Sequence, residues 1–308
     1  MFRSKPLAYQ SAKAVLEYIS FEKRKHFYAM CPAIRKMEEI LPYHLELVSL
    51  WSMAQDHIIT GIDSFGFSFW DNEGNQIRMN NHSKRKFVDQ FTCLGPEQAV
   101  EKFFLYNLNR EGTRIKNVEL NKAPEFISKC IPIAIKNMTV FKTDAWFPTN
   151  IPIENVEVDT TLREDALKIP KHVTVRIPVY VATRINAEIV SEWNCESIKI
   201  DSPMQSEVIA YYCNKVSKRT NRPIGSRLMA RHSLPVKFVH DILYSKMNAR
   251  KTMLNGRECA TISIDESTEL NVYCSTDDHY FVVVEVCAKG TAIEVFLHFS
   301  MMHGLYWK

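Results

Sequence analysis

The opening stretch of the chain, residues 6–42, alternates apolar and polar positions with the period of a helix. The spacing i, i+3, i+4, i+7 gives a first helix its apolar side, made of Ala12, Val15, Leu16 and Ile19. Ser20 can cap a second helix, and Pro32 stands where a third can begin without losing a needed donor. We therefore predict a three-helix headpiece over residues 1–44. About forty residues bury too little surface to fold alone, so the headpiece has to pack against the body or a partner.

Beyond the headpiece the pattern changes from helical to extended. Residues 45–51 alternate apolar and polar positions, and residues 58–70 are rich in β-branched and aromatic side chains. Residues 71–75 form a turn sequence, after which residues 76–80 can return as the second arm of a hairpin. Pro96 then opens a predicted helix.

The last third of the chain is predicted to hold helices first and strands afterwards. Helices are expected over residues 183–193, over residues 204–217 and from Pro235 onward. The remainder reads as four strands, at residues 259–264, 270–274, 280–286 and 292–299. Lys289 and Gly290 predict a hairpin turn between the last two of them.

An internal repeat occupies the middle of the chain. The pattern Ile-x-x-Val-x-Val occurs, with substitutions, at residues 115–120, 135–140, 153–158 and 195–200, with a weaker copy at 170–175. A strand motif at this period resembles the leucine-rich repeat, although the asparagine that usually follows the last apolar position is missing. The alternatives are an irregular α/β solenoid and an ordinary mixed sheet whose strands look alike. We predict the solenoid, within a mixed α+β and α/β fold.

If the apolar positions of the repeat face the core, the residues alternating with them share the opposite face. Polar columns on stacked parallel strands are the usual binding surface of solenoids, but any half-solvated sheet shows them too. The candidate partner-binding residues are Glu119, Asn121, Thr139, Phe141, Glu157, Asp159, Thr174, Arg176, Lys199 and Asp201.

Composition narrows the class of protein. The 308 residues carry a net charge of +4, with 46% hydrophobic and 24% charged residues, which is ordinary for a globular protein with a full core. The mild charge gives no reason to expect a nucleic-acid partner, and we interpret the basic runs 84–86 and 215–222 as solvated loops or helix ends. No stretch reads as a signal peptide or membrane span, and the eight cysteines are scattered. We expect no membrane partner and a cytoplasmic, possibly also nuclear, location.

No catalytic motif is recognisable. The nine glycines do not cluster into a phosphate loop, and no nucleophile elbow or metal-binding HExxH occurs. The group Asp277-Asp278-His279 lies between two predicted strands and is interpreted as a solvated turn. We therefore expect no catalytic residues, no metal and no cofactor; a hydrolase-like site would need a pocket where histidine and carboxylate groups converge.

Several short motifs resemble those of a known family. Pro6-Leu7, residues 15–19, Arg24 and residues 31–35 resemble a divergent F-box, and Pro-Leu-x-Tyr-x-Ser with Cys-Pro-x-Ile-Arg is similar to the nematode F-box-like proteins that carry an F-box-associated domain of unknown function. Residues 257–262 resemble the end of that domain. The resemblance implies a headpiece at residues 1–44 and an associated domain at 45–308, with its repeats at about 113–218 and its β segment at about 256–308.

The same resemblance implies a function. It predicts a non-enzymatic adaptor, the substrate-recognition subunit of an SCF-type ubiquitin ligase, which binds a Skp-type adaptor and an unknown protein substrate. The docking surface would be formed or supported by Leu7, Val15, Leu16, Ile19 and Pro32. The alternative is a stand-alone structural or ligand-binding protein whose headpiece no longer docks. Burial of Val15, Leu16 and Ile19 against the protein's own β domain would favour that alternative.

Overall fold

The computed structural model describes residues 9–54, 56–71, 74–81, 86–121, 126, 133–141, 153–158, 171–176, 184–219 and 222–294. Its fold is mixed α/β, with three helices preceding a large amount of sheet. The chain divides into two compact units, one made of residues 1–180 and 192–201, the other of residues 181–191 and 202–308. The headpiece thus groups with the first unit, and its separation as a domain at residue 44 stays a prediction.

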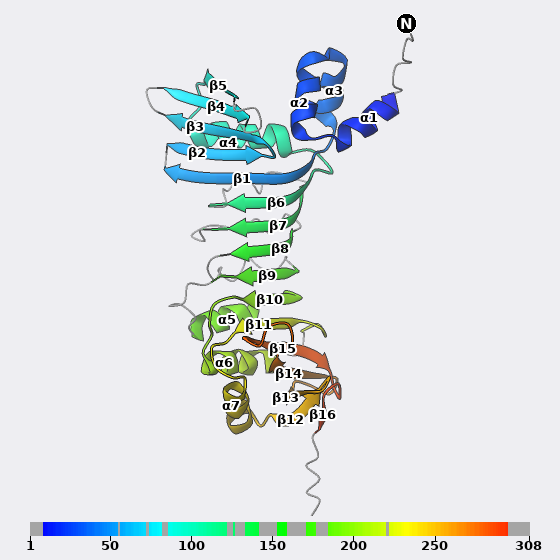
Figure 1. Cartoon of the computed structure of the whole chain (residues 1–308), viewed down its shortest axis with the longest axis vertical. Helices are drawn as coiled ribbons and strands as arrows, with labels where there is room; N and C mark the ends of the chain where they lie inside the picture. Colours follow the sequence, from blue (N-terminus) through cyan, green and yellow to red (C-terminus); the bar gives the residue numbers. More distant parts are fainter. Residues whose placement is uncertain are drawn as a thin grey trace, which may run out of the picture. The chain divides into compact units, whose positions relative to one another are not determined.

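The three predicted N-terminal helices are confirmed. They are α1 (Tyr9–Tyr18), α2 (Phe21–Met30) and α3 (Pro32–Ile40), all visible in blue in Figure 1. Pro32 opens α3, as expected for a residue without a backbone donor. Leu16, Met37 and Leu41 form a small core in which α1 and α3 bury their apolar sides.

The first unit continues as an antiparallel meander. Its strands are β1 (His44–Ala54), β2 (His57–Ile62), β3 (Phe65–Asp71), β4 (Asn75–Asn81) and β5 (Lys86–Phe91). The hairpin around residues 71–75 is confirmed as the β3–β4 connection. Helix α4 (Pro96–Leu108) covers β2 and β3, with the rings of Phe103 and Phe67 4.3 Å apart. Of the basic run 84–86, residues 84 and 85 lie outside the described residues; Lys86 is exposed, as predicted, but it opens β5 and does not lie in a loop.

The repeats form parallel strands on the other side of β1. They are β6 (Arg114–Leu120), β7 (Ala134–Val140), β8 (Ile153–Val158), β9 (His172–Val175) and β10 (Ser197–Ile200), stacked in that order (Figure 1). The pairing is in register, because Val118 lies opposite Met138 and Met138 opposite Val156. Strand β1 extends the stack through the pair Val48–Val118.

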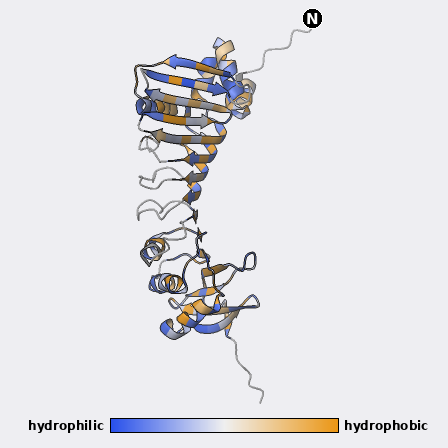
Figure 2. Cartoon of the chain, turned by 60° about the vertical axis from the view of Figure 1, so that its left-hand side comes forward, coloured by the Kyte–Doolittle hydropathy of each residue, from blue (hydrophilic) through white to orange (hydrophobic). Residues whose placement is uncertain are grey.

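The repeat pattern determines which side chains are buried. In β6 the buried residues are Ile115, Val118 and Leu120, and β7 shows the same pattern. Because the first two are three positions apart, each of these strands turns two consecutive residues outward before the alternation resumes. Figure 2 shows apolar and polar residues mixed along these strands. The strict period-2 assumption therefore missed one outward residue in each of these strands, such as Lys116.

The second unit is an antiparallel sheet with helices. Its strands are β11 (Arg227–Arg231), β12 (Arg250–Leu254), β13 (Arg257–Ser263), β14 (Thr268–Cys274), β15 (Phe281–Ala288) and β16 (Ile293–Glu294). Within the unit their order is β16-β12-β13-β14-β15-β11. The predicted helices are present as α5 (Arg184–Glu192), α6 (Ser206–Ser217) and α7 (Lys237–Met247). Helix α7 packs on β13, and α6 on β14.

The hairpin predicted at Lys289 and Gly290 is wrong. Gly290 does turn the chain, with a φ of 84°, but β16 pairs with β12 and not with β15. Strand β15 already has β14 on one edge and β11 on the other, so it has no free edge to offer. The chain instead continues to the open edge of β12.

Candidate protein-interaction surfaces

The residues expected to form the docking surface of the headpiece differ in exposure. Val15 is 50% exposed and Pro32 is exposed as well, whereas Leu16 is only 3% exposed. Ile19 is partly buried against the same core as Leu16. Leu7 lies outside the described residues. Leu16 and Ile19 can therefore support a docking surface from beneath, and Val15 and Pro32 can form part of one.

Further apolar side chains of the headpiece reach solvent. They are Tyr18, Phe27, Met30 and Ile40, each well exposed. None of these four residues was in the docking surface predicted from the sequence. In so small a bundle only one narrow side of each helix meets the core, and the remaining apolar residues face outward.

The headpiece is joined to its sheet through a cluster of buried charges. The Glu38 carboxylate is fully buried and receives the Lys25 ammonium at 3.1 Å, the Arg110 guanidinium at 3.4 Å and a hydrogen bond from the Tyr43 hydroxyl. Arg24 is equally buried and donates to the carbonyls of α3 and the segment after it, including Leu41 at 2.5 Å. Both guanidinium groups lie over the Tyr43 ring, with centroid distances of 4.0 and 4.6 Å.

This Glu38 cluster is a structural joint. Burial opposes ionisation of Glu38, but the Tyr43 hydrogen bond and the Lys25 and Arg110 charges outweigh it and lower its pKa. Burial lowers the pKa of Arg24 and of Lys25, and raises that of Tyr43. Because one carboxylate holds cations from α2 and from the end of α4, the cluster fixes the headpiece against the sheet. Only Arg24 had been singled out in the sequence.

The outward face of the repeat strands brings together half of the ten predicted partner-binding residues, and one other, Asp159, lies outside the described residues. Glu119, Thr139, Glu157, Thr174 and Lys199 occupy equivalent positions on neighbouring strands and are partly exposed. Their polar side chains form one continuous row across β6–β10.

The residues at the strand ends behave differently. Arg176 is exposed and pairs with Glu157 at 2.6 Å, and Asp201 lies 3.6 Å from Lys199. Phe141 stacks on Trp51, with ring centroids 5.0 Å apart. The exposure predicted for Asn121 is wrong, because it is 9% exposed and its amide donates to the Ser52 carbonyl.

A side-chain ladder crosses the same face. The Asn137 amide donates to Asn117 at 2.9 Å, and the Asn155 amide donates to Asn137 at 2.8 Å. Asn117 in turn donates to the backbone carbonyl of Glu46 at 3.1 Å. These bonds use the in-register spacing of about 4.8 Å between strands, which lets identical side chains bridge neighbours. The ladder holds four strands of the face in a fixed arrangement.

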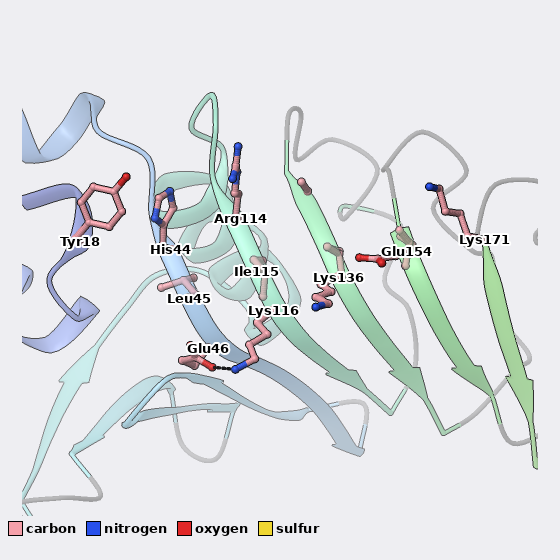
Figure 3. A pocket seen from close by; sticks show the side chains of 13 residues that line it. Tyr18, His44, Leu45, Glu46, Arg114, Ile115, Lys116, Lys136, Glu154 and Lys171 are labelled. Carbon is pink, nitrogen blue, oxygen red and sulfur yellow. Dashed lines mark hydrogen bonds and ion pairs between the residues drawn. The ribbon is translucent and has the colours of Figure 1, made fainter. Parts of the chain in front are cut away.

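A hollow of about 810 Å³ opens where β1, β6, β7 and β8 begin. Leu45, Ile115, Ile135 and Ile153 also line it, but their side chains are almost completely buried. Tyr18 and His44 lie at the headpiece end, with their rings 5.3 Å apart, and Lys171 lies at the other end (Figure 3). The hollow belongs wholly to the first unit.

The rim of the hollow is charged. Its cations are Arg114, Lys116, Lys136 and Lys171, and its carboxylates are Glu46 and Glu154. Lys116 is paired with Glu46 at 2.8 Å, as the dashed line in Figure 3 shows. The sequence did contain a signal for this rim. Ile115 and Val118 are three positions apart, so two residues between them face outward where strict alternation allows one.

The described residues also contain one serine–histidine pair. The Ser206 hydroxyl lies 3.0 Å from Nε2 of His232, whose Nδ1 lies 2.5 Å from the Leu234 carbonyl. Both side chains are buried, and burial lowers the pKa of His232. With its second ring nitrogen on a backbone carbonyl, the pair lacks the carboxylate that orients a catalytic histidine, and we interpret it as a structural hydrogen bond.

The described residues contain no group of three or more histidine, cysteine or acidic side chains placed to hold a metal ion. None of the helices in the described part of the chain has both the length and the apolar character that crossing a membrane requires. Comparisons with protein-family models, with curated proteins and with solved structures found no match for this chain.

Proposed function

We propose that this chain is a non-enzymatic protein-interaction adaptor. In this proposal the outward face of β1 and β6–β10 binds a partner protein, and the headpiece binds a Skp-type adaptor of an SCF ubiquitin ligase. The observation that carries it is the uniform outward face of the repeat strands, on which polar side chains lie in register and an asparagine ladder holds them. A pre-organised polar surface binds without a large cost in side-chain ordering.

The arrangement of the repeat strands supports the same proposal. We interpret β6–β10 as an irregular array resembling leucine-rich repeats, because each strand is parallel to the last and buries equivalent positions. Repeat arrays of this kind present extended surfaces to protein partners. An adaptor of this type would act in the cytoplasm or the nucleus.

The docking part of the proposal rests on the exposed apolar residues of the headpiece. Val15, Met30 and Ile40 are each at least half exposed, although Leu16 is buried. Helix surfaces that bind a partner do so through a few apolar anchors, and these residues are available for that role. The resemblance of residues 6–35 to an F-box supplies the identity of the expected partner.

The alternative proposal is a stand-alone structural or ligand-binding protein. The observation that favours it is the Glu38 cluster, which links the headpiece through a buried ion pair to Arg110, between α4 and β6. A headpiece so fixed is part of the fold, whether or not it also binds a second protein.

Binding of the full-length chain to a purified Skp-type adaptor, measured by isothermal titration calorimetry, separates the two proposals. The informative variant is Val15→Asp, which places a charge on an exposed apolar position and leaves the core intact. We expect it to weaken binding by about tenfold or more, because a charge buried in an apolar interface costs at least 1.4 kcal/mol.

The matched control is Gln10→Asp, which adds the same charge at an exposed position of the same helix. It should leave binding unchanged. Leu16→Asp is unsuitable as a docking variant, because it would disrupt the core with Met37 and Leu41. If the wild-type chain does not bind the adaptor, the ligase proposal fails and the stand-alone alternative stands.

A further inference from the structure

The hollow at the start of β1, β6, β7 and β8 has more cations than carboxylates. Arg114, Lys136 and Lys171 form no ion pair with any of the described residues, whereas Lys116 is neutralised by Glu46. Glu154 is the remaining carboxylate of the rim, so the lining carries a net charge of +2 with His44 neutral. Figure 3 shows Arg114 and Lys136 on neighbouring strands, with Glu154 on the next strand and Lys171 beyond it.

From this charge pattern we propose that the hollow binds an extended acidic segment of a partner protein. The inference rests on the proposed adaptor function and specifies the chemistry of its partner. Carboxylates of such a segment would pair with Arg114, Lys136 and Lys171.

The dimensions of the hollow suit an extended peptide. It spans the starts of four strands and the residue before β9, and neighbouring strands lie about 4.8 Å apart, which gives about 19 Å in all. An extended chain of about six residues covers that length. Arg114 lies on β6, Lys136 on β7 and Lys171 just before β9, so acidic side chains spread along the peptide can reach one cation after another.

A nucleic acid fits the same hollow less well. The rim interrupts its cations with Glu46 and Glu154, which would face the phosphates of any strand crossing it. Single-stranded nucleic acids also bind through rows of aromatic side chains, and Tyr18 and His44 lie at one end only.

The test is fluorescence anisotropy of the full chain with a fluorescein-labelled polyglutamate peptide of about ten residues, long enough to span the hollow. Labelled polylysine and oligothymidine of the same length are the comparison probes. We expect polyglutamate to bind more tightly than both, with an affinity that falls as sodium chloride is raised. Equal binding of polylysine, or tighter binding of oligothymidine, would overturn the acidic-peptide proposal.

Variants locate the binding. The double change Arg114→Glu with Lys136→Glu should weaken polyglutamate binding by about tenfold or more, because it replaces attraction by repulsion at two contacts. Its matched control is Lys102→Glu with Lys237→Glu, at two exposed positions on α4 and α7 that do not line the hollow. Glu154→Gln removes the unpaired carboxylate and should tighten binding. An equal loss in the control pair, or no change in the hollow variants, places the binding elsewhere.

This experiment can fail separately from the proposed function. Docking to the Skp-type adaptor depends on Val15 and its neighbours, none of which the hollow variants change. If the adaptor binds and polyglutamate does not, the acidic-peptide inference alone is wrong. If polyglutamate binds at the hollow and the adaptor does not, the ligase proposal fails and the site remains as an acidic-peptide site.

Discussion

The first unit contains two groups of cations with opposite surroundings. Arg110 of one group and Arg114 of the other are only four residues apart in sequence. Arg110 is almost completely buried and shares Glu38 with Lys25, whereas Arg114 is exposed on the rim of the hollow. A buried cation without a partner costs several kcal/mol, so Arg110 requires Glu38. An exposed cation is stabilised by hydration, so it needs no partner in the fold and is available to bind a ligand. The comparison separates charges that hold the fold from charges that are free to bind.

The largest effect is expected at the centre of the buried group. Glu38→Ala leaves Arg24, Lys25 and Arg110 without their common carboxylate, and we expect a loss of about 3–5 kcal/mol in the free energy of unfolding. Urea unfolding followed by tryptophan fluorescence measures it, because Trp51, Trp70 and Trp193 belong to the first unit.

Glu39→Ala is the control, since this neighbouring carboxylate is exposed and, within the described part of the chain, its one hydrogen bond comes from Tyr28. It should change the free energy of unfolding by about 0.5 kcal/mol or less. Equal losses in the two variants would show that the buried cluster has no special role in stability.

A smaller effect is expected from pH. The pKa of Glu38 is lower in the folded protein than its usual value of 4.5, so its ionised form stabilises the fold above that pH. As the pH falls below 4.5 and through the folded pKa, Glu38 takes up a proton and this stabilisation is lost. Below about pH 4.5, the urea concentration at the unfolding midpoint should therefore decrease more steeply with falling pH for the wild type than for Glu38→Gln. Parallel pH profiles would assign the acid sensitivity to other groups.

How much of this the sequence could predict depends on the range of the interaction. The headpiece helices, the hairpin at residues 71–75 and the repeat strands follow from local periodicity, and all are present. The Glu38 cluster could not be predicted, because Arg110 is 72 residues away from Glu38 and only the packed fold brings them together. The same holds for β16, whose partner was decided by which edges other strands had left open.

The candidate surfaces show the same division. The repeat motif itself contained the information that two adjacent residues face outward, since Ile115 and Val118 are both buried. Because a strict period of two was assumed, Lys116 and Lys136 were left out of the predicted outward residues. The rim of the hollow was therefore not predicted. His44 and Leu45 were not assigned to the repeat, although Leu45-x-x-Val48-x-Leu50 matches its pattern and joins its stack through the β1–β6 pairing.

The smallest expected effect completes the comparison between Arg110 and Arg114. Arg114→Gln removes an exposed charge that has no ion-pair partner among the described residues, so the free energy of unfolding should change by about 0.5 kcal/mol or less. Arg110→Gln, measured beside it by urea unfolding, removes one of the cations of the buried carboxylate and should destabilise by more. A loss for Arg114→Gln as large as for Arg110→Gln would mean that the rim charges hold the fold as well, and a charge that the fold needs is not free for a partner.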